Sequence, residues 1–122
     1  MTEGEQQIII LRGIAASPGI VRGPASIVPS WSEIHRVEHG SVLVARTTEP
    51  DMFSVFFKVR GVITDLGGAT SHAATNAREL GLPCVVGVGN ATNIISDGDM
   101  VTVDGNSGEI RVEKTDNSLH PR

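Results

Sequence analysis

The residues of this sequence that are best suited to chemistry lie together in the middle of the chain. A glycine pair, Gly67 and Gly68, is followed by Thr70, Ser71 and His72. Glycines let a ligand or another chain approach the backbone closely. A histidine can act as a nucleophile, and neighbouring hydroxyl groups can donate hydrogen bonds to an anion. This segment is therefore the first candidate for a functional site.

A helix is predicted directly after this segment, from about residue 71 to Leu80, because alanines recur at helical spacing. Either Thr70 or Ser71 is a good N-cap, which places His72 in the first turn. Free N–H groups and the positive end of the helix dipole favour an anion such as phosphate there. The same dipole favours a neutral imidazole, whose lone pair a nucleophile needs.

Short strands are predicted before and after this helix in the sequence, because runs of β-branched residues alternate with turn residues along the chain. Seven are expected: Gln6–Leu11, Gly23–Val28, Ser41–Ala45, Val62–Thr64, Cys84–Val86, Met100–Val103 and Glu109–Val112. The last two are separated by a turn-rich segment and predict a hairpin. Residues 13–19 and 30–40 are expected to be connections.

A further helix is predicted to begin at Pro50, capped by Thr48 or Glu49 and ended by Gly61, with apolar residues at helical spacing between them. A third, short helix is expected over residues 90–95. Helices and strands alternate in the middle of the chain, while both ends are all β. The prediction is an α/β fold, a compact sandwich of short strands with two main helices.

Composition limits the classes of function. The chain has 122 residues and a formal net charge of -4, which argues against electrostatic binding of nucleic acid. No apolar run is long enough to span a membrane, and the acidic, polar start is unlike a secretory signal, so the expected location is the cytoplasm. Cys84 is the single cysteine, which excludes an intramolecular disulfide, and it is expected in the core. One domain is predicted over residues 1–113, followed by a flexible tail over 114–122.

Other histidines offer no second site of comparable strength. His35 and His39 are four residues apart, as two metal ligands on one helix would be, but Gly40 and the low helical tendency of this segment weaken a metal interpretation. His120 has no matching partner in the sequence. These three histidines are interpreted as surface residues, and no metal site is predicted.

The central segment resembles a known signature. The runs Gly67–Ala74 and Ala77–Gly87 are similar to the phosphohistidine signature of the phosphoenolpyruvate-utilising enzymes, which include pyruvate phosphate dikinase, phosphoenolpyruvate synthase and enzyme I of the sugar phosphotransferase system. The likeness extends to residues 13–23, 41–51 and 97–105. In that family the domain has a swivelling β/β/α fold, which the resemblance implies here.

The resemblance also implies a role for individual residues. His72 corresponds to the histidine that carries the phosphoryl group. A set of neighbours is expected to position the phosphate: Gly67, Gly68, Thr70, Ser71 and Arg78. Thr70 also matches a position that is a regulatory phosphorylation site in some dikinases. For Arg78, a surface ion pair is an equally good interpretation.

The family's other modules are not recognisable in this sequence. It contains no glycine-rich nucleotide loop, and 122 residues leave no room for a (β/α)₈ barrel of about 250 residues. The resemblance implies two partners, an ATP-grasp-type nucleotide-binding module and a module that binds phosphoenolpyruvate or pyruvate. Mg²⁺ and ATP or phosphoenolpyruvate are expected at those partners, and no cofactor at this chain. The alternative is a non-catalytic interaction or regulatory module that keeps the fold without phosphotransfer.

Overall fold

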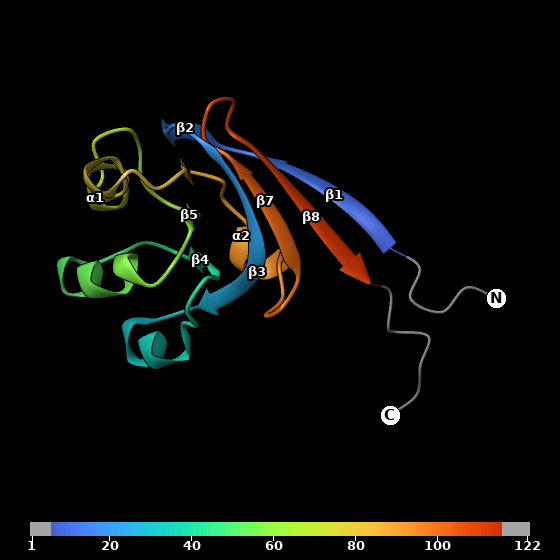
Figure 1. Ribbon diagram of the computed structural model, residues 1–122, viewed down its shortest axis with the longest axis horizontal. Helices are drawn as coiled ribbons and strands as arrows, with labels where there is room; N and C mark the ends of the chain where they lie inside the picture. The colour runs from blue at the N-terminus through green and yellow to red at the C-terminus, as the bar shows by residue number, and fades with distance from the viewer. Residues whose placement is uncertain (1–5, 116–122) are drawn as a thin grey trace.

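Eight strands form one curled sheet in the computed structural model, which describes residues 6–115 (Figure 1). The strands are β1 (Gln6–Arg12), β2 (Ile14–Ser17), β3 (Ile20–Val28), β4 (Val42–Ala45), β5 (Gly61–Thr64), β6 (Cys84–Val86), β7 (Met100–Asp104) and β8 (Glu109–Thr115). The helical elements are the 3-10 helices η1 (Trp31–Arg36) and η2 (Pro50–Phe57) and the α-helices α1 (His72–Leu80) and α2 (Ala91–Ile94). Across the sheet the strand order is β1-β8-β7-β3-β4-β5-β6-β2.

The long strand β3 joins two halves of this sheet. Its first residues pair with β7 in the antiparallel direction, whereas residues 25–28 pair with β4 in the parallel direction. The strands β3, β4, β5 and β6 are parallel to one another. The loops that follow β4, β5 and β6 therefore leave the sheet at the same edge, and one of them, after β5, carries the glycine pair and the histidine.

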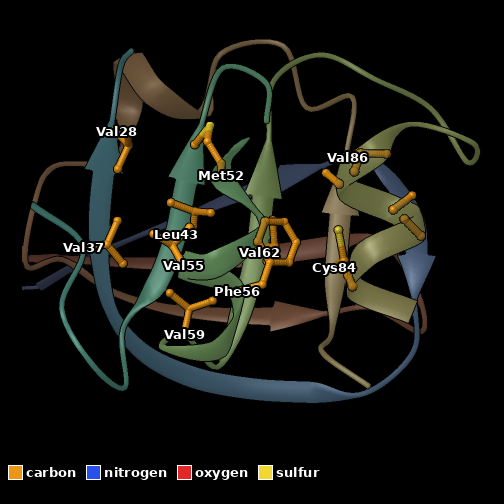
Figure 2. Close-up of a cluster of buried hydrophobic side chains, with 14 residues drawn as sticks. Val28, Val37, Leu43, Met52, Val55, Phe56, Val59, Val62, Cys84 and Val86 are labelled. Carbon is orange, nitrogen blue, oxygen red and sulfur yellow. The ribbon is translucent and has the colours of Figure 1, made fainter. Parts of the chain in front are cut away.

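Two apolar cores result, because side chains alternate between the two faces of a strand. On β4, Val42 and Val44 belong to the core that includes residues of β7 and β8, whereas Leu43 belongs to the core beneath the helices. Figure 1 shows α1 and the 3-10 helices on one side of β4 and β5, and β7, β8 and β1 on the other. Figure 2 shows the helix-side core, in which Phe56 of η2 is 1% exposed and Cys84 of β6 lies beside α1. The molecule thus has two β layers and one helical layer, as the predicted β/β/α fold requires.

All seven predicted strands are confirmed, but the connection predicted over residues 13–19 is wrong for its central part. Residues Ile14–Ser17 form β2, which pairs with β6 in the antiparallel direction and has an irregularity between Ala15 and Ser17. Two adjacent alanines carry little β propensity. The strand forms because its partner β6 supplies backbone hydrogen bonds from about 70 residues away in the chain, and local sequence does not reveal this pairing.

The predicted helices are confirmed in position, but the one from Pro50 differs in type and ends at Phe57, whereas Gly61, its predicted end, is the first residue of β5. The helix from Pro50 is a 3-10 helix with Glu49 at its N-cap, and its i→i+3 hydrogen bonds include Lys58 N to the Val55 carbonyl at 2.9 Å. The short helix α2 lies where it was expected. Residues 31–36, predicted to be part of a connection, form η1.

The end of the domain also differs from the prediction. Strand β8 continues to Thr115, so residues 114 and 115, which were assigned to a tail, pair with the first residues of β1. The rest of the predicted tail, residues 116–122, lies outside the described residues. Within residues 6–115, no helix is long and apolar enough to cross a membrane.

Candidate functional site

His72 is the first residue of α1, and its side chain is exposed to solvent. Ser71 precedes it with extended backbone and caps the helix, since its Oγ accepts a hydrogen bond from Ala74 N at 3.3 Å. The N–H groups of the first helical turn have no acceptor within the helix. The structure therefore places an accessible imidazole at a helix end that favours an anion. Ser71, one of the two predicted caps, is the one that the structure uses.

The glycine pair gives the loop its shape and its open surface. Gly67 has a φ of +107°, and a Cβ on it would lie 3.1 Å from the side chain of Ser71. A side chain at Gly67 would thus be both strained and crowded. A Cβ at Gly68 would meet no atom within 4 Å. The backbone conformation at Gly67 therefore favours glycine. At Gly68, the absence of a side chain leaves the backbone exposed to open space.

Hydrogen bonds to β4 and within the turn fix the start of the loop. Asp65 N donates to the Ala45 carbonyl at 3.1 Å, and Leu66 N donates to the Arg46 carbonyl at 2.8 Å. Thr64 Oγ1 donates to the Leu66 carbonyl at 2.7 Å. The backbone at Asp65 and Leu66, which leads into the glycine pair, is therefore held both by residues 45 and 46 and by the side chain of Thr64.

Asp65 is a buried carboxylate, 5% exposed, and is not among the residues predicted from the sequence. One oxygen, Oδ1, accepts from Ala91 N, while Oδ2 accepts from Thr92 Oγ1 at 2.6 Å and from Thr92 N at 3.3 Å. The carboxylate thus caps α2, and the loop after β5 is joined to the segment after β6. An acidic residue directly after a buried strand was the available signal, but its partners lie 26 and 27 residues further along the chain.

Arg78 is exposed on α1 and hydrogen-bonds to the backbone of the loop. Its Nη2 donates to the Ala69 carbonyl and its Nη1 to the Ala16 carbonyl, both at 2.8 Å. The guanidinium therefore connects the histidine loop to β2. The sequence suggested that Arg78 contacts either a phosphate or a surface carboxylate. The structure shows bonds to two backbone carbonyls instead. A role in positioning phosphate through direct contact stays a prediction.

Thr70 is exposed beside His72, one residue before the N-cap. Thr70 is two residues before His72 in the chain. Roles for Thr70 in phosphate positioning and regulation stay predictions, as do those of Gly67, Gly68 and Ser71 toward phosphate.

The histidines outside the loop lie apart from this site. His35 is in η1, whereas His39 follows Val37, whose backbone is extended, so the two are not on one helix face. Both side chains are exposed. Among residues 6–115, no group of three or more His, Cys, Asp or Glu side chains is placed to hold a metal ion. His120 lies outside the described residues.

Cys84 is fully buried in the helix-side core, which confirms the interpretation as a core residue. Burial raises the pKa of its thiol to about 12, an effect that the positive charge of Arg78 partly offsets. A thiol with so high a pKa is almost entirely protonated at neutral pH and is a poor nucleophile.

The order of elements, the glycine loop and the exposed histidine agree with a β/β/α domain that presents a histidine to solvent, and comparison with known proteins shows its family. The chain belongs to the family of PEP-utilising enzymes, mobile domain, whose model matches residues 37–108. This range includes β4, the whole histidine loop, α1 and β7. The resemblance inferred from the sequence is thereby confirmed.

Relatives in full-length enzymes are similar over most of this chain. It is 43% identical over 107 residues to a probable phosphoenolpyruvate synthase of Methanothermobacter thermautotrophicus, covering 88% of this chain and 16% of that protein. It is 46% identical over 106 residues to the phosphoenolpyruvate synthase of Pyrococcus furiosus, covering 87% of this chain and 13% of that protein. The chain therefore spans about a sixth or less of the length of these two relatives, whose remaining length holds other parts of the protein.

Solved structures confirm the fold. A solution structure of enzyme I (nEIt) is 38% identical, with a TM-score of 0.58, covering 70% of this chain and 36% of that one. The aconitase X of Thermococcus kodakaraensis is 20% identical, with a TM-score of 0.65, covering 85% of this chain and 98% of that one. The second likeness shows the fold alone. The expected α/β fold of the family's mobile domain is confirmed by the first.

Proposed function

We propose that this chain is a phosphoryl carrier, in which His72 is transiently phosphorylated and passes the phosphoryl group between two partner modules. The observation that carries the proposal is the exposed imidazole at the N-terminus of α1, inside a loop that the family model covers. An exposed histidine can enter a partner's active site, and a Cβ at Gly68 in the same loop would meet no atom within 4 Å. A structural histidine would be expected to have buried contacts instead.

The chemistry is a reversible transfer between nitrogen and oxygen. With phosphoenolpyruvate as donor, the Nε2 lone pair of His72 attacks phosphorus, the N–P bond forms and the O–P bond breaks. The electron pair of the broken bond stays on the enolate oxygen, and the enolate takes a proton at carbon to give pyruvate. In the reverse direction, phosphohistidine phosphorylates the enolate of pyruvate. Positioning and charge stabilisation supply most of the catalysis in such transfers.

This chain presents the imidazole of His72 and stabilises the negative charge of the phosphoryl group that is transferred to it. Free N–H groups of the first turn of α1 point toward an anion beside His72. The hydroxyl groups of Thr70 and Ser71 are the neighbouring donors, and the guanidinium of Arg78 adds positive charge at Ala69 of the loop. Donor and acceptor sites, with ATP, Mg²⁺ and phosphoenolpyruvate or pyruvate, belong to an ATP-grasp-type module and a phosphoenolpyruvate-type module. This chain covers only 16% and 13% of the two phosphoenolpyruvate synthases, which supports the presence of such modules in the rest of those proteins.

The test is labelling of the purified chain in a desalted lysate of its source organism, with labelled phosphoenolpyruvate and β-labelled ATP in parallel. We expect acid-labile, base-stable label on the chain and none on His72→Ala. His35→Ala is the matched control, because His35 is also exposed and lies in a different element. A folded chain that takes no label from either donor would contradict the carrier function and favour the non-catalytic module.

A further inference from the structure

Strand β1 is a free edge of the sheet and carries two exposed isoleucines. Within residues 6–115 it pairs with β8 on one side and stands at the end of the strand order. Ile8 is 42% exposed and Ile10 is 40% exposed, and no other strand of the described chain has two large hydrophobic residues in solvent. Because residues two apart share a face of a strand, Ile8 and Ile10 form an apolar pair on one face of this edge.

The isoleucine pair lies on the face of β1 that is turned away from the core. Ile9 and Leu11, on the other face, pack with residues of β7 and β8 in an apolar core. On β8, the register partners of the isoleucine pair are Glu113 and Arg111, and Glu113 forms an ion pair with Arg22 of β3 at 2.9 Å. The sheet beside the isoleucine pair is therefore charged, and the fold of this chain does not account for two apolar side chains at its edge.

The two edges of the sheet differ in how they are protected against pairing with a further strand. Natural proteins commonly shorten an edge strand, bulge it, or place charges or proline on it. The edge strand β2 has four residues and an irregularity between Ala15 and Ser17. Strand β1 has seven residues in unbroken register with β8, and residues 7–11 include no charged residue, proline or glycine. The unprotected edge is thus the one that carries the isoleucine pair.

We propose that β1 pairs with β1 of a second copy of this chain, antiparallel and about a two-fold axis at Ile9. In this register Ile8 of each copy lies opposite Ile10 of the other, because reversing the strand about Ile9 exchanges the two isoleucines. Each isoleucine pair is then covered by the other through apolar cross-strand contacts, which stabilise a sheet. No like charges meet, since residues 7–11 are uncharged. The strand is therefore complementary to itself, as the interface of a two-fold dimer must be.

This dimer leaves the candidate histidine site uncovered. Figure 1 shows β1 and α1, the helix that begins at His72, on opposite sides of the molecule. The helix α1 packs on β2, β5, β6 and η2, at the other end of the strand order from β1. The interface neither uses nor blocks His72, so the dimer is independent of the proposed carrier function.

The test is sedimentation velocity of the purified chain, in which we expect a shift from one copy to two between about 1 μM and 1 mM. The double variant Ile8→Lys/Ile10→Lys sets lysines opposite lysines across the interface, so its dimer dissociation constant should rise roughly tenfold or more. The matched control is Ile20→Lys, because Ile20 is 59% exposed on β3, which has neighbouring strands on both sides. The control should change the dissociation constant by less than about threefold.

A mixture of two variants tests the register and shows that both variants fold. Ile8→Glu/Ile10→Glu mixed with Ile8→Lys/Ile10→Lys places opposite charges across the interface, so the mixed dimer should be tighter than the dimer of either variant alone. A mixture that associates no more tightly than its components overturns the proposed register. A wild-type chain that stays single up to about 1 mM, or one that assembles beyond two copies, overturns the closed dimer. Equal weakening by Ile20→Lys, or none by the lysine double variant, overturns the assignment of the interface to β1.

Discussion

The guanidinium of Arg78 donates a hydrogen bond from Nη2 to the backbone carbonyl of Ala69, with 2.8 Å between the two atoms. A second bond, from Nη1 to the Ala16 carbonyl, extends the connection to β2. Arg78 thus connects the loop of His72 to β2. The guanidinium that makes this connection is six residues further along the same helix than the histidine.

Replacing Arg78 should therefore loosen the histidine loop. Arg78→Lys keeps the charge but loses the planar fork, so one ammonium group cannot reproduce both carbonyl contacts. We expect the free energy of unfolding to fall by about 1 kcal/mol in urea titrations, since Arg78 is partly exposed to solvent. Amide hydrogen exchange should become faster at residues 67–71. Arg60→Lys is the control, because Arg60 makes a longer bond, 3.3 Å, to the Arg22 carbonyl. Unchanged stability and exchange in Arg78→Lys would contradict this support.

The two glycines of the loop should respond differently to alanine. Gly67→Ala should lower the free energy of unfolding by about 1–3 kcal/mol, because φ at Gly67 is +107° and the new methyl group would press on Ser71. Gly68→Ala should change it by less than about 0.5 kcal/mol, because a Cβ there meets no atom within 4 Å. Urea unfolding of the pair measures the difference. Equal losses of stability would show that the loop has a different backbone conformation.

The buried carboxylate of Asp65 should contribute to stability through the segment after β6. Asp65→Asn puts an amide donor against the donors of Thr92 and Ala91, so we expect a loss of about 1–3 kcal/mol in the free energy of unfolding. Thr92→Val, which removes one of these donors, should cost less. Glu79→Gln is the control, since Glu79 is exposed on α1. Unfolding of Asp65→Asn and Glu79→Gln at the same urea concentration would contradict the capping role of Asp65.

The thiol of Cys84 should make stability depend on alkaline pH. Its pKa is about 12 in the folded chain and 9.0 in the absence of burial, so the unfolded chain loses its proton first as the pH rises. The stabilisation is present in full below pH 9 and is lost as the pH increases toward 12. Urea titrations between pH 8 and pH 10.5 should show a steeper decline for the wild-type chain than for Cys84→Ala. Parallel declines would mean that the thiol ionises equally in both states.

Local features of the sequence were sufficient to predict the helix that begins at His72. Ser71, His72 and Gly81 follow helix-end rules that depend on neighbouring residues alone, and the structure confirms the helix at these positions. The strands β4, β5 and β6 could likewise be predicted from their runs of β-branched residues, because strands buried on both faces are continuously apolar. The family signature then added the expected role of His72.

Features that depend on distant residues could not be predicted in this way. Strand β2 exists because it pairs with β6, and nothing in Ile14–Ser17 itself indicates a strand. The contacts of Arg78 reach a carbonyl 62 residues away, and those of Asp65 reach a helix that begins 26 residues later. These partners are far apart in the chain and become neighbours only in the folded sheet, so the sequence identified the candidate histidine but not the residues that hold its loop.

The most direct test of the carrier function is to locate the phosphate by tandem mass spectrometry under alkaline conditions. The chain contains four histidines, His35, His39, His72 and His120. After incubation with the donor and lysate, the account predicts a phosphate on His72 and on no other histidine. His72→Ala should keep the wild-type urea midpoint, because the side chain is exposed, and should carry no phosphate. Phosphate on another histidine, or none on a folded wild-type chain with either donor, would contradict the central claim.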